Sequence, residues 1–136
     1  MGATADGADA AALAARLGIT KGTTVMEIGY DTDTDDLLAE AVVVGSGEPV
    51  VDEDYEGVVD MVVLWWRDED GDLTDALVDA KPPLADHGVI WLVTPKFARP
   101  GAVAPADIAE AAATSGLRRT TSLTLAGWQA VRLAAR

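Results

Sequence analysis

Three clusters of carboxylates are the groups in this sequence best suited to chemistry. They fall within residues 31–36, residues 52–56 and residues 68–72, and the last cluster reads DEDGD. Oxygen ligands of this kind bind hard cations such as Ca²⁺ or Mg²⁺, and a dense negative surface also attracts a basic partner. The commoner roles of such residues are helix capping and solvation. Because DEDGD lacks the full spacing and the closing glutamate of an EF-hand loop, we assign no metal ligand.

Each acidic cluster directly follows a segment with the pattern of a strand. The three segments are residues 23–28, 49–51 and 60–66. If these strands run parallel, their carboxyl ends meet at one end of a sheet, which is where ligands bind in open α/β sheets. The sequence therefore predicts one acidic rim that binds a ligand or a partner. The candidate residues of this acidic rim are Glu27, Gly29, Tyr30, Asp31, Asp33, Asp52, Asp54, Trp66, Asp68, Asp70, Asp72 and Lys96.

Two adjacent tryptophans lie on one predicted strand. Trp65 and Trp66 must point to opposite faces of the sheet, and either one can belong to the core under a helix. Alternatively, one of them lines a pocket at the rim beside Tyr30, where an aromatic ring stacks on an apolar or cationic ligand. Core packing is the commoner role, and the pattern alone leaves both interpretations open.

Lys96 and His87 lie at opposite ends of the predicted strand 88–94. The ammonium group of Lys96 should reach the acidic rim, where we expect an ion pair with Asp31 or Asp68 rather than a covalent role. His87 precedes the strand, so we expect it at the surface and not as a catalytic base. No catalytic residue is therefore assigned.

The composition excludes several classes of protein. The chain has 136 residues, 49% of them hydrophobic, with no cysteine and a formal net charge of −13. The lack of cysteine excludes disulfides, thiolate nucleophiles and Cys-ligated metal clusters. No apolar run approaches the roughly 20 residues that span a bilayer, and the N-terminus lacks the basic region of a secretory signal. We expect a cytoplasmic protein.

The charge is divided unevenly along the chain. Residues 27–86 hold 19 carboxylates and two bases, whereas residues 87–136 hold two carboxylates and six bases. The acidic middle argues against nucleic acid and against anionic membranes, because both bind clusters of Lys and Arg. It favours a protein partner with basic residues. The basic C-terminal third also predicts self-association, as a homodimer or head to tail.

Hydrophobic periodicity predicts an alternation of helices and strands. Helices are expected at 8–17, from an N-cap at Asp33 or Thr34 to residue 44, at 73–80 and between Pro105 and Gly116. Strands are expected at 23–28, 49–51, 60–66 and 88–94, with two more after Gly116 that join near 126–127. This order indicates an open, mostly parallel, three-layer α/β sheet with a C-terminal antiparallel hairpin at one edge. Residues 1–7 are expected as a flexible tail and residues 8–136 as one domain.

The phrase KGTTVMEIG at 21–29 and the order of the elements resemble class I methyltransferase-like Rossmann domains. In that family a glycine-rich loop of the form acid-x-Gly-x-Gly surrounds the methionine part of S-adenosylmethionine. Glu27 and Gly29 match this loop, but Asp31 stands in place of the second glycine and Asp33 follows. A carboxylate there adds bulk and repels the carboxylate of the cofactor. The resemblance implies the fold. The altered loop, in contrast, leads us to expect no S-adenosylmethionine cofactor and no methyl transfer.

Four longer strings cover almost the entire chain: EIGYD, VDEDYEGVVDMVVLWWRDEDGDLTDALVDA, LVTPK and the terminal W…RL. Together they resemble an uncharacterised actinobacterial family, the domain of unknown function 3052. This resemblance implies a bacterial cytoplasmic protein, and it supplies no reaction, cofactor or catalytic residue.

These observations lead to two main hypotheses of function. In the first, the chain is a non-catalytic, methyltransferase-like binding or regulatory protein that presents its acidic rim and exposed aromatic residues to a basic or amphipathic protein. In the second, it is a small enzyme or binding protein that takes an S-adenosyl or nucleotide ligand at the rim around Gly29. A third interpretation, binding of a divalent cation, predicts a calcium-dependent rise in melting temperature.

Overall fold

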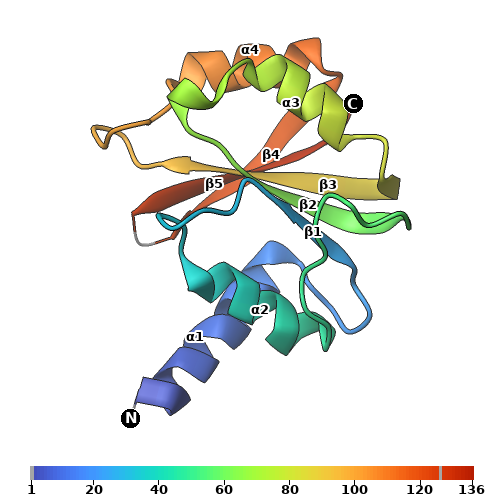
Figure 1. The fold of residues 1–136 in the computed structure, drawn as a ribbon, viewed down its shortest axis with the longest axis vertical. Coiled ribbons are helices and arrows are strands. Elements are labelled where there is room, and N and C mark those ends of the chain that lie inside the picture. Colours follow the sequence, from blue (N-terminus) through green and yellow to red (C-terminus); the bar gives the residue numbers. More distant parts are fainter. Residues whose placement is uncertain (1, 126) are drawn as a thin grey trace.

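The computed structural model of the chain describes residues 2–125 and 127–136, and their side chains from Asp9 onward. Helices and strands alternate through most of the chain (Figure 1). In chain order the elements are α1 (Gly2–Leu17), β1 (Val25–Ile28), α2 (Asp36–Ser46), β2 (Val59–Trp65), the short 3-10 turn η1 (Asp68–Asp70), α3 (Leu73–Ala80), β3 (Leu84–Pro95), α4 (Pro105–Thr114), β4 (Leu117–Leu125) and β5 (Trp128–Ala135).

The strands form one sheet in the order β1-β2-β3-β5-β4. β1, β2 and β3 are parallel, with Glu27 opposite Val63 and Val63 opposite Trp91. β5 pairs antiparallel with both β3 and β4, so the C-terminal hairpin lies at one edge of the sheet. The predicted mostly parallel α/β sheet with an antiparallel hairpin is confirmed.

Helices cover both faces of this sheet (Figure 1). α1 and α2 lie on one face, and α3 and α4 lie on the other. Leu13 and Leu17, four residues apart on α1, are buried against the sheet as their spacing predicts. β2 and the second half of β3 are buried on both faces, which explains their continuous apolar sequences. Each face has its own core, with Trp91 in the first and Ile90 in the second.

Two helices begin elsewhere than predicted. α1 begins at Gly2, six residues before the predicted start at residue 8. α2 begins after Asp35, because the carboxylate of Asp35 accepts the backbone N–H of Leu37 at 2.8 Å. Asp35 is thus the N-cap in place of the residues expected at 33 and 34. None of the described helices has the length and apolar character needed to cross a membrane.

The predicted strand at 49–51 is reduced to a single parallel bridge between Val51 and Met26. Pro49 lacks a backbone N–H and cannot extend a ladder of hydrogen bonds. The bridge holds the chain beside the outer edge of β1: Val51 donates its N–H to Val25 at 2.8 Å and accepts that of Glu27 at 2.9 Å. The direction expected for this segment is correct, although the strand itself does not form.

Candidate functional site

The acidic rim lies at the carboxyl end of the parallel strands. Residues 31–36 follow β1, and residues 68–72 follow β2, which pairs with β1 in parallel register. Residues 52–56 follow Val51, whose bridge to β1 is also parallel. The structure thus places residues 31–36 and residues 68–72 at the same end of the sheet. Residues 52–56 instead lead from the bridge at Val51 back toward the start of β2, and Glu53 and Glu56 line a cavity with the residues that precede β3.

The loop between β1 and α2 turns sharply at Gly29. This residue has a φ of 84°, and a Cβ added here would overlap the backbone carbonyl of Trp65. Asp31 stabilises the next part of the loop: its carboxylate accepts the backbone N–H of Thr32 at 2.7 Å, and its carbonyl accepts the hydroxyl of Thr34 at 2.8 Å. Glycine is therefore required at this position by the close approach of the end of β2.

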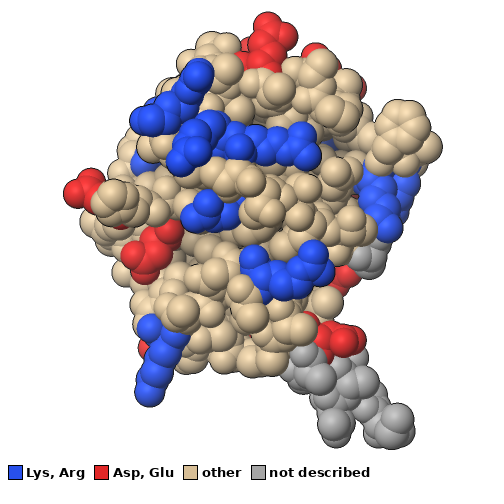
Figure 2. Space-filling view, turned by 180° about the vertical axis from the view of Figure 1, so that it is seen from behind, with Lys and Arg blue, Asp and Glu red and all other residues tan. Residues whose placement is uncertain are grey.

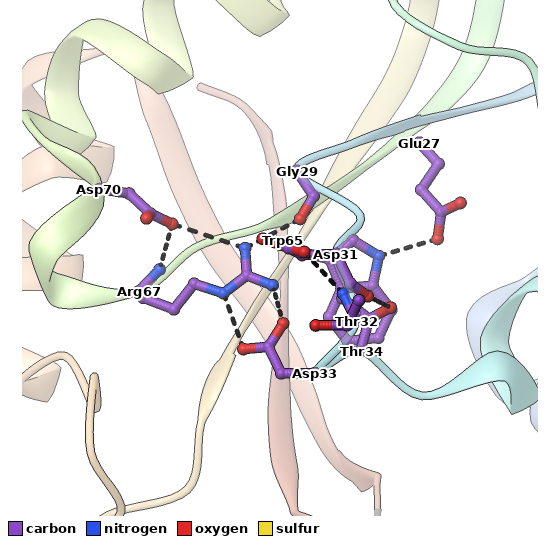
Figure 3. A network of polar contacts seen from close by, with 9 residues as sticks. All are labelled: Glu27, Gly29, Asp31, Thr32, Asp33, Thr34, Trp65, Arg67 and Asp70. Atoms are coloured by element: carbon purple, nitrogen blue, oxygen red, sulfur yellow. Dashed lines mark hydrogen bonds and ion pairs between the residues drawn. The ribbon is translucent and has the colours of Figure 1, made fainter.

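The guanidinium of Arg67 closes this loop (Figure 3). Its Nη1 donates to the carbonyl of Gly29 at 2.8 Å, while Nε and Nη2 donate to the two carboxylate oxygens of Asp33 at 3.2 Å and 2.6 Å. The guanidinium also lies 3.5 Å from a carboxylate oxygen of Asp70 and 5.3 Å from the centre of the Trp128 ring. With its side chain only 11% exposed, Arg67 fills the space between the β1–α2 loop and the end of β2.

The pairing shifts the pKa values of both partners. The hydrogen bonds from Arg67 hold the pKa of Asp33 below its ordinary value. Burial acts to lower the pKa of Arg67, but the hydrogen bonds and charges of Asp33 and Asp70 outweigh burial and raise it. Arg67 and Asp33 are therefore both charged at neutral pH, and the loop stays closed by an ion pair.

Arg67, and not Lys96, is the counter-ion of the acidic rim. Both ion pairs formed among the described residues belong to Arg67, so the expected pairing of Lys96 with Asp31 or Asp68 is wrong. β2 lies between β3 and β1, so Arg67, which follows β2, is nearer to the β1–α2 loop than Lys96, which follows β3. Lys96 lies beside the C-terminal hairpin, where its backbone N–H donates to the carbonyl of Gly127 at 3.1 Å. Arg67 is one of two bases among residues 27–86, and that scarcity is the signal that could have identified it.

Glu27 is engaged within the protein, on the face covered by α1 and α2. Its carboxylate accepts the indole N–H of Trp65 at 2.8 Å, and the ring of Trp65 meets that of Trp128 edge-on, with 4.8 Å between centroids. Burial raises the pKa of Glu27 and the charge of Asp36 adds to this effect, while the hydrogen bond from Trp65 opposes it. The acidic residue of the sequence motif thus orients a tryptophan of the core.

Asp52 and Asp72 cap local structure. Asp52 accepts the backbone N–H of Asp54 at 3.0 Å, and Asp72, the N-cap of α3, accepts that of Asp75 at 3.2 Å. Capping is therefore part of what the acidic clusters do. Within residues 2–125 and 127–136, no group of three or more Asp, Glu or His side chains is arranged to hold a metal ion.

Tyr30, Asp54 and Asp68 present their side chains to solvent. Tyr30 is 58% exposed, and its hydroxyl donates to Asp36 at 3.4 Å. Asp54 and Asp68 are exposed and form no ion pair with any base of the described chain. These groups are accessible to a partner.

A cavity of about 660 Å³ lies beside the rim, on the face covered by α3. Its lining includes Met26 of β1, the ring of Trp66, and Tyr55 from the loop before β2. Trp66 thus lines a cavity, as one interpretation of the sequence predicted, but the aromatic residue beside it there is Tyr55 rather than Tyr30. The sequence pattern did not indicate this cavity.

Basic side chains gather on the opposite edge of the sheet. Figure 2 shows the face behind the view of Figure 1, where Lys and Arg side chains cluster and few Asp or Glu are visible. β4 is the edge strand on this side and exposes Arg118 and Arg119, with Arg132 half-buried on the neighbouring β5. β3 and β5 therefore separate this basic edge from β1 and β2, whose ends carry the acidic rim.

Sequence comparison finds relatives in mycobacteria. Residues 14–136 match the model of the family described as "Protein of unknown function (DUF3052)". The chain is 52% identical over 133 residues to an uncharacterised protein of Mycobacterium bovis, and equally to one of Mycobacterium tuberculosis. These alignments cover 97% of this chain and 84% of each relative.

The fold is similar to that of several solved structures, among them proteins described as methyltransferases. Magnesium protoporphyrin IX methyltransferase (ChlM) from Synechocystis, with bound SAM, has a TM-score of 0.58 and 15% identity over 96% of this chain and 80% of its own. A SAM-dependent methyltransferase from Aquifex aeolicus has a TM-score of 0.57 and 13% identity over 93% and 88%. The pyocyanin biosynthetic protein PhzM has a TM-score of 0.67 and 11% identity over 89% of this chain, which spans 52% of PhzM. These likenesses establish a methyltransferase-like Rossmann fold.

Proposed function

The chain belongs to the DUF3052 family and has a methyltransferase-like fold, and from this premise we propose that it is a non-catalytic binding protein of the bacterial cytoplasm. Its partner is a protein with a basic, amphipathic segment that binds at the acidic rim. The observation that carries the proposal is the position of Arg67, which bridges Gly29 and Asp33 across the loop that resembles a cofactor loop.

The closed loop argues against a cofactor. In the methyltransferases that residues 21–29 resemble, the loop after the first strand surrounds the methionine part of S-adenosylmethionine. Here an S-adenosyl ligand would have to displace Arg67 from Gly29 and bring its own carboxylate close to Asp31 and Asp33. Like charges a few ångströms apart cost on the order of 1 kcal/mol in water and several where water is excluded. These costs support a role without methyl transfer.

The remaining carboxylates of the rim support a basic partner. Because Arg67 forms both ion pairs of the described residues, Asp54 and Asp68 are left without a base. A surface of unpaired negative charge attracts segments rich in Lys and Arg and speeds their association. Tyr55, which is 42% exposed, and Trp66 lie beside these charges and offer apolar contacts to an amphipathic segment.

Fluorescence polarisation tests the proposal, with a short fluorescein-labelled peptide that alternates lysine and leucine as the probe. We expect saturable binding at low ionic strength that weakens as salt is added. The double variant Asp54→Asn with Asp68→Asn should weaken binding about fivefold, because it removes two exposed charges at the rim.

The matched control is Glu40→Gln with Glu48→Gln. Both glutamates are exposed, on α2 and just after it, so the control removes the same charge from residues that belong to none of the three acidic clusters. It should change the affinity by less than about twofold. The proposal fails if the wild-type protein does not bind the peptide at low salt, or if both double variants weaken binding equally.

An S-adenosyl or nucleotide ligand is the second candidate function, and the SAM bound to ChlM is the observation that favours it. Calorimetry with S-adenosylmethionine and S-adenosylhomocysteine separates the two functions. A non-catalytic binding protein with a closed loop should give no heat of specific binding with either compound. Micromolar binding to the wild-type protein would mean that the ligand displaces Arg67, and it would favour the second candidate.

A second copy of the chain is one partner that carries the required basic residues. Arg118 and Arg119 are exposed on the edge strand β4 and are free to face the acidic rim of a neighbouring copy. We expect light scattering at low ionic strength to reveal a species larger than the monomer, which salt dissociates and which Arg118→Gln with Arg119→Gln weakens. If the protein remains strictly monomeric at low salt, the basic segment that binds the acidic rim must belong to a different protein.

A further inference from the structure

Trp66 lies between two hollows on the face of the sheet covered by α3. One is the cavity of about 660 Å³, and the other, of about 240 Å³, is lined by the start of α3 and by α4. Trp66 belongs to the lining of both, so the two hollows share this residue. Trp65 and Trp91 donate their indole N–H groups to Glu27 and Leu17, whereas Trp66 forms no such hydrogen bond among the described residues.

Both hollows are lined by carboxylates and by no base. Glu53, Glu56 and Asp79 line the larger one, and four more carboxylates, among them Asp68, line the smaller one. Neither lining contains Lys, Arg or His. Arg67 directly follows Trp66 but is bound by Asp33 and lies over the ring of Trp128, in the core of the other face. The negative charge of the hollows is therefore left for an occupant to balance.

The larger cavity exists because no helix covers the outer part of the sheet on this face. β1 is an edge strand, and the chain between α2 and β2 contains no helix of its own. Met26 is buried at the base of the cavity, whereas Ile28 and Trp66 are only half-buried. An apolar floor that is open to solvent and bordered by carboxylates suits an occupant that is both apolar and cationic.

We infer that these hollows hold an extended basic segment of the partner, with one apolar side chain anchored in the cavity beside Trp66. The inference rests on the proposed function and locates the site within it. A volume of about 660 Å³ lies within the range of roughly 300–1,000 Å³ typical of ligand pockets. It accommodates a leucine-sized or phenylalanine-sized side chain together with its flanking backbone. Acidic hollows on both sides of Trp66 favour an elongated occupant, because basic residues before and after the anchor then each face carboxylates.

The first test compares two fluorescein-labelled peptides on the wild-type protein. Both are lysine-rich; one has a single central leucine and the other has alanine in its place. The leucine peptide should bind about tenfold more tightly, because burial of the larger apolar side chain is the main difference between them. Equal affinity overturns the anchor and leaves the proposed function intact. Failure of both peptides to bind removes the proposed function and the anchor together.

The second test fills the cavity from α3. Ala76 is half-buried in the cavity lining, and Ala76→Leu adds volume there with little change in helix propensity. The leucine peptide should bind about tenfold more weakly to this variant, whereas the alanine peptide should lose less than about twofold. The matched control is Ala113→Leu, because Ala113 is exposed on α4 and lines neither hollow. Equal effects of the two substitutions on the leucine peptide would overturn the inference.

Discussion

Trp65 and Trp66 are consecutive in the chain, yet they have opposite surroundings. Trp65 is fully buried, its N–H is bound by Glu27 at 2.8 Å, and its ring packs edge-on against Trp128. Trp66 is half-buried and lines an open cavity with Tyr55. Because successive residues of a strand point to opposite faces, one step along the chain separates a closed region from an open one.

The closed region satisfies its polar groups internally. Arg67 binds the carbonyl of Gly29 and both carboxylate oxygens of Asp33, and Glu27 binds Trp65. The open region has carboxylates but no base in its lining. The loop that resembles a cofactor loop is therefore held by Arg67 against the segment that follows β2. The comparison supports the site proposed on the face covered by α3, where the carboxylates of both hollows have no base in the lining.

The most damaging change to the closed region should be Gly29→Ala. A Cβ at this position would overlap the carbonyl of Trp65, and the backbone has a φ of 84°. The left-handed backbone costs about 1–2 kcal/mol for an L-residue, and overpacking adds about 1–3 kcal/mol. Urea unfolding should show the sum of both costs in the free energy of unfolding.

Gly22→Ala is the matched control for this substitution. Gly22 has a φ of 88°, but a Cβ added there would meet no atom within 4 Å. It should therefore show only the backbone cost of about 1–2 kcal/mol. If the two variants were equally stable, the end of β2 would not press on the loop, and the closed region would be looser than the structure indicates.

The second change opens the loop without touching its backbone. Arg67→Met keeps an apolar stem over Trp128 but removes every side-chain donor to Gly29, Asp33 and Asp70. The arginine side chain is 11% exposed but that of Asp33 is 54% exposed, so water can replace part of the pairing. We expect a loss of about 1–2 kcal/mol in the free energy of unfolding.

The pH dependence identifies the ion pair as the cause of that loss. The pKa of Asp33 is lowered in the folded protein, so the pair contributes stability above the ordinary aspartate value of about 3.9. This contribution is lost as the pH falls through the lowered pKa. The difference between wild type and Arg67→Met should hold at neutral pH and shrink below about pH 4. A pH-independent difference would attribute the loss to packing on Trp128 alone.

The fold could be predicted where the pattern of apolar residues decides the structure. Continuous apolar runs at 61–66 and 88–94 indicated strands covered on both faces, and these runs form the centre of the parallel sheet. The same reasoning overestimated the segment at 49–51. Its two valines resemble a strand, but Pro49 cannot donate to a neighbour, and only one bridge forms.

The candidate site could be predicted in position but not in pairing. Parallel strands place the clusters at 31–36 and 68–72 at one end of the sheet whatever their side chains do, whereas the cluster at 52–56 follows no complete strand and leads back toward the start of β2. Whether Arg67 or Lys96 pairs with the loop depends on which strand lies next to β1. The order of the strands in the sheet cannot be predicted from the spacing of residues along the chain. The cavity results from a missing helix over β1. Its only signal in the sequence is the lack of a helical pattern between residues 47 and 58.

The smallest and most specific effect should come from Glu27→Gln, which acts in the opposite direction to Arg67→Met. Burial raises the pKa of Glu27, so folding favours its protonated form. The stability that this form contributes is complete below the ordinary glutamate value of about 4.3 and is lost as the pH rises through the raised pKa. A glutamine oxygen can still accept the N–H of Trp65 without carrying charge. The variant should therefore be more stable than wild type at pH 7, by less than about 1 kcal/mol, and should lose this advantage near pH 4.

Thermal unfolding at the two pH values measures the effect, with the exposed Glu40→Gln as control. A destabilised variant at pH 7 would mean that Trp65 requires a charged acceptor, and that the closed region depends on charged side chains on both sides of Gly29.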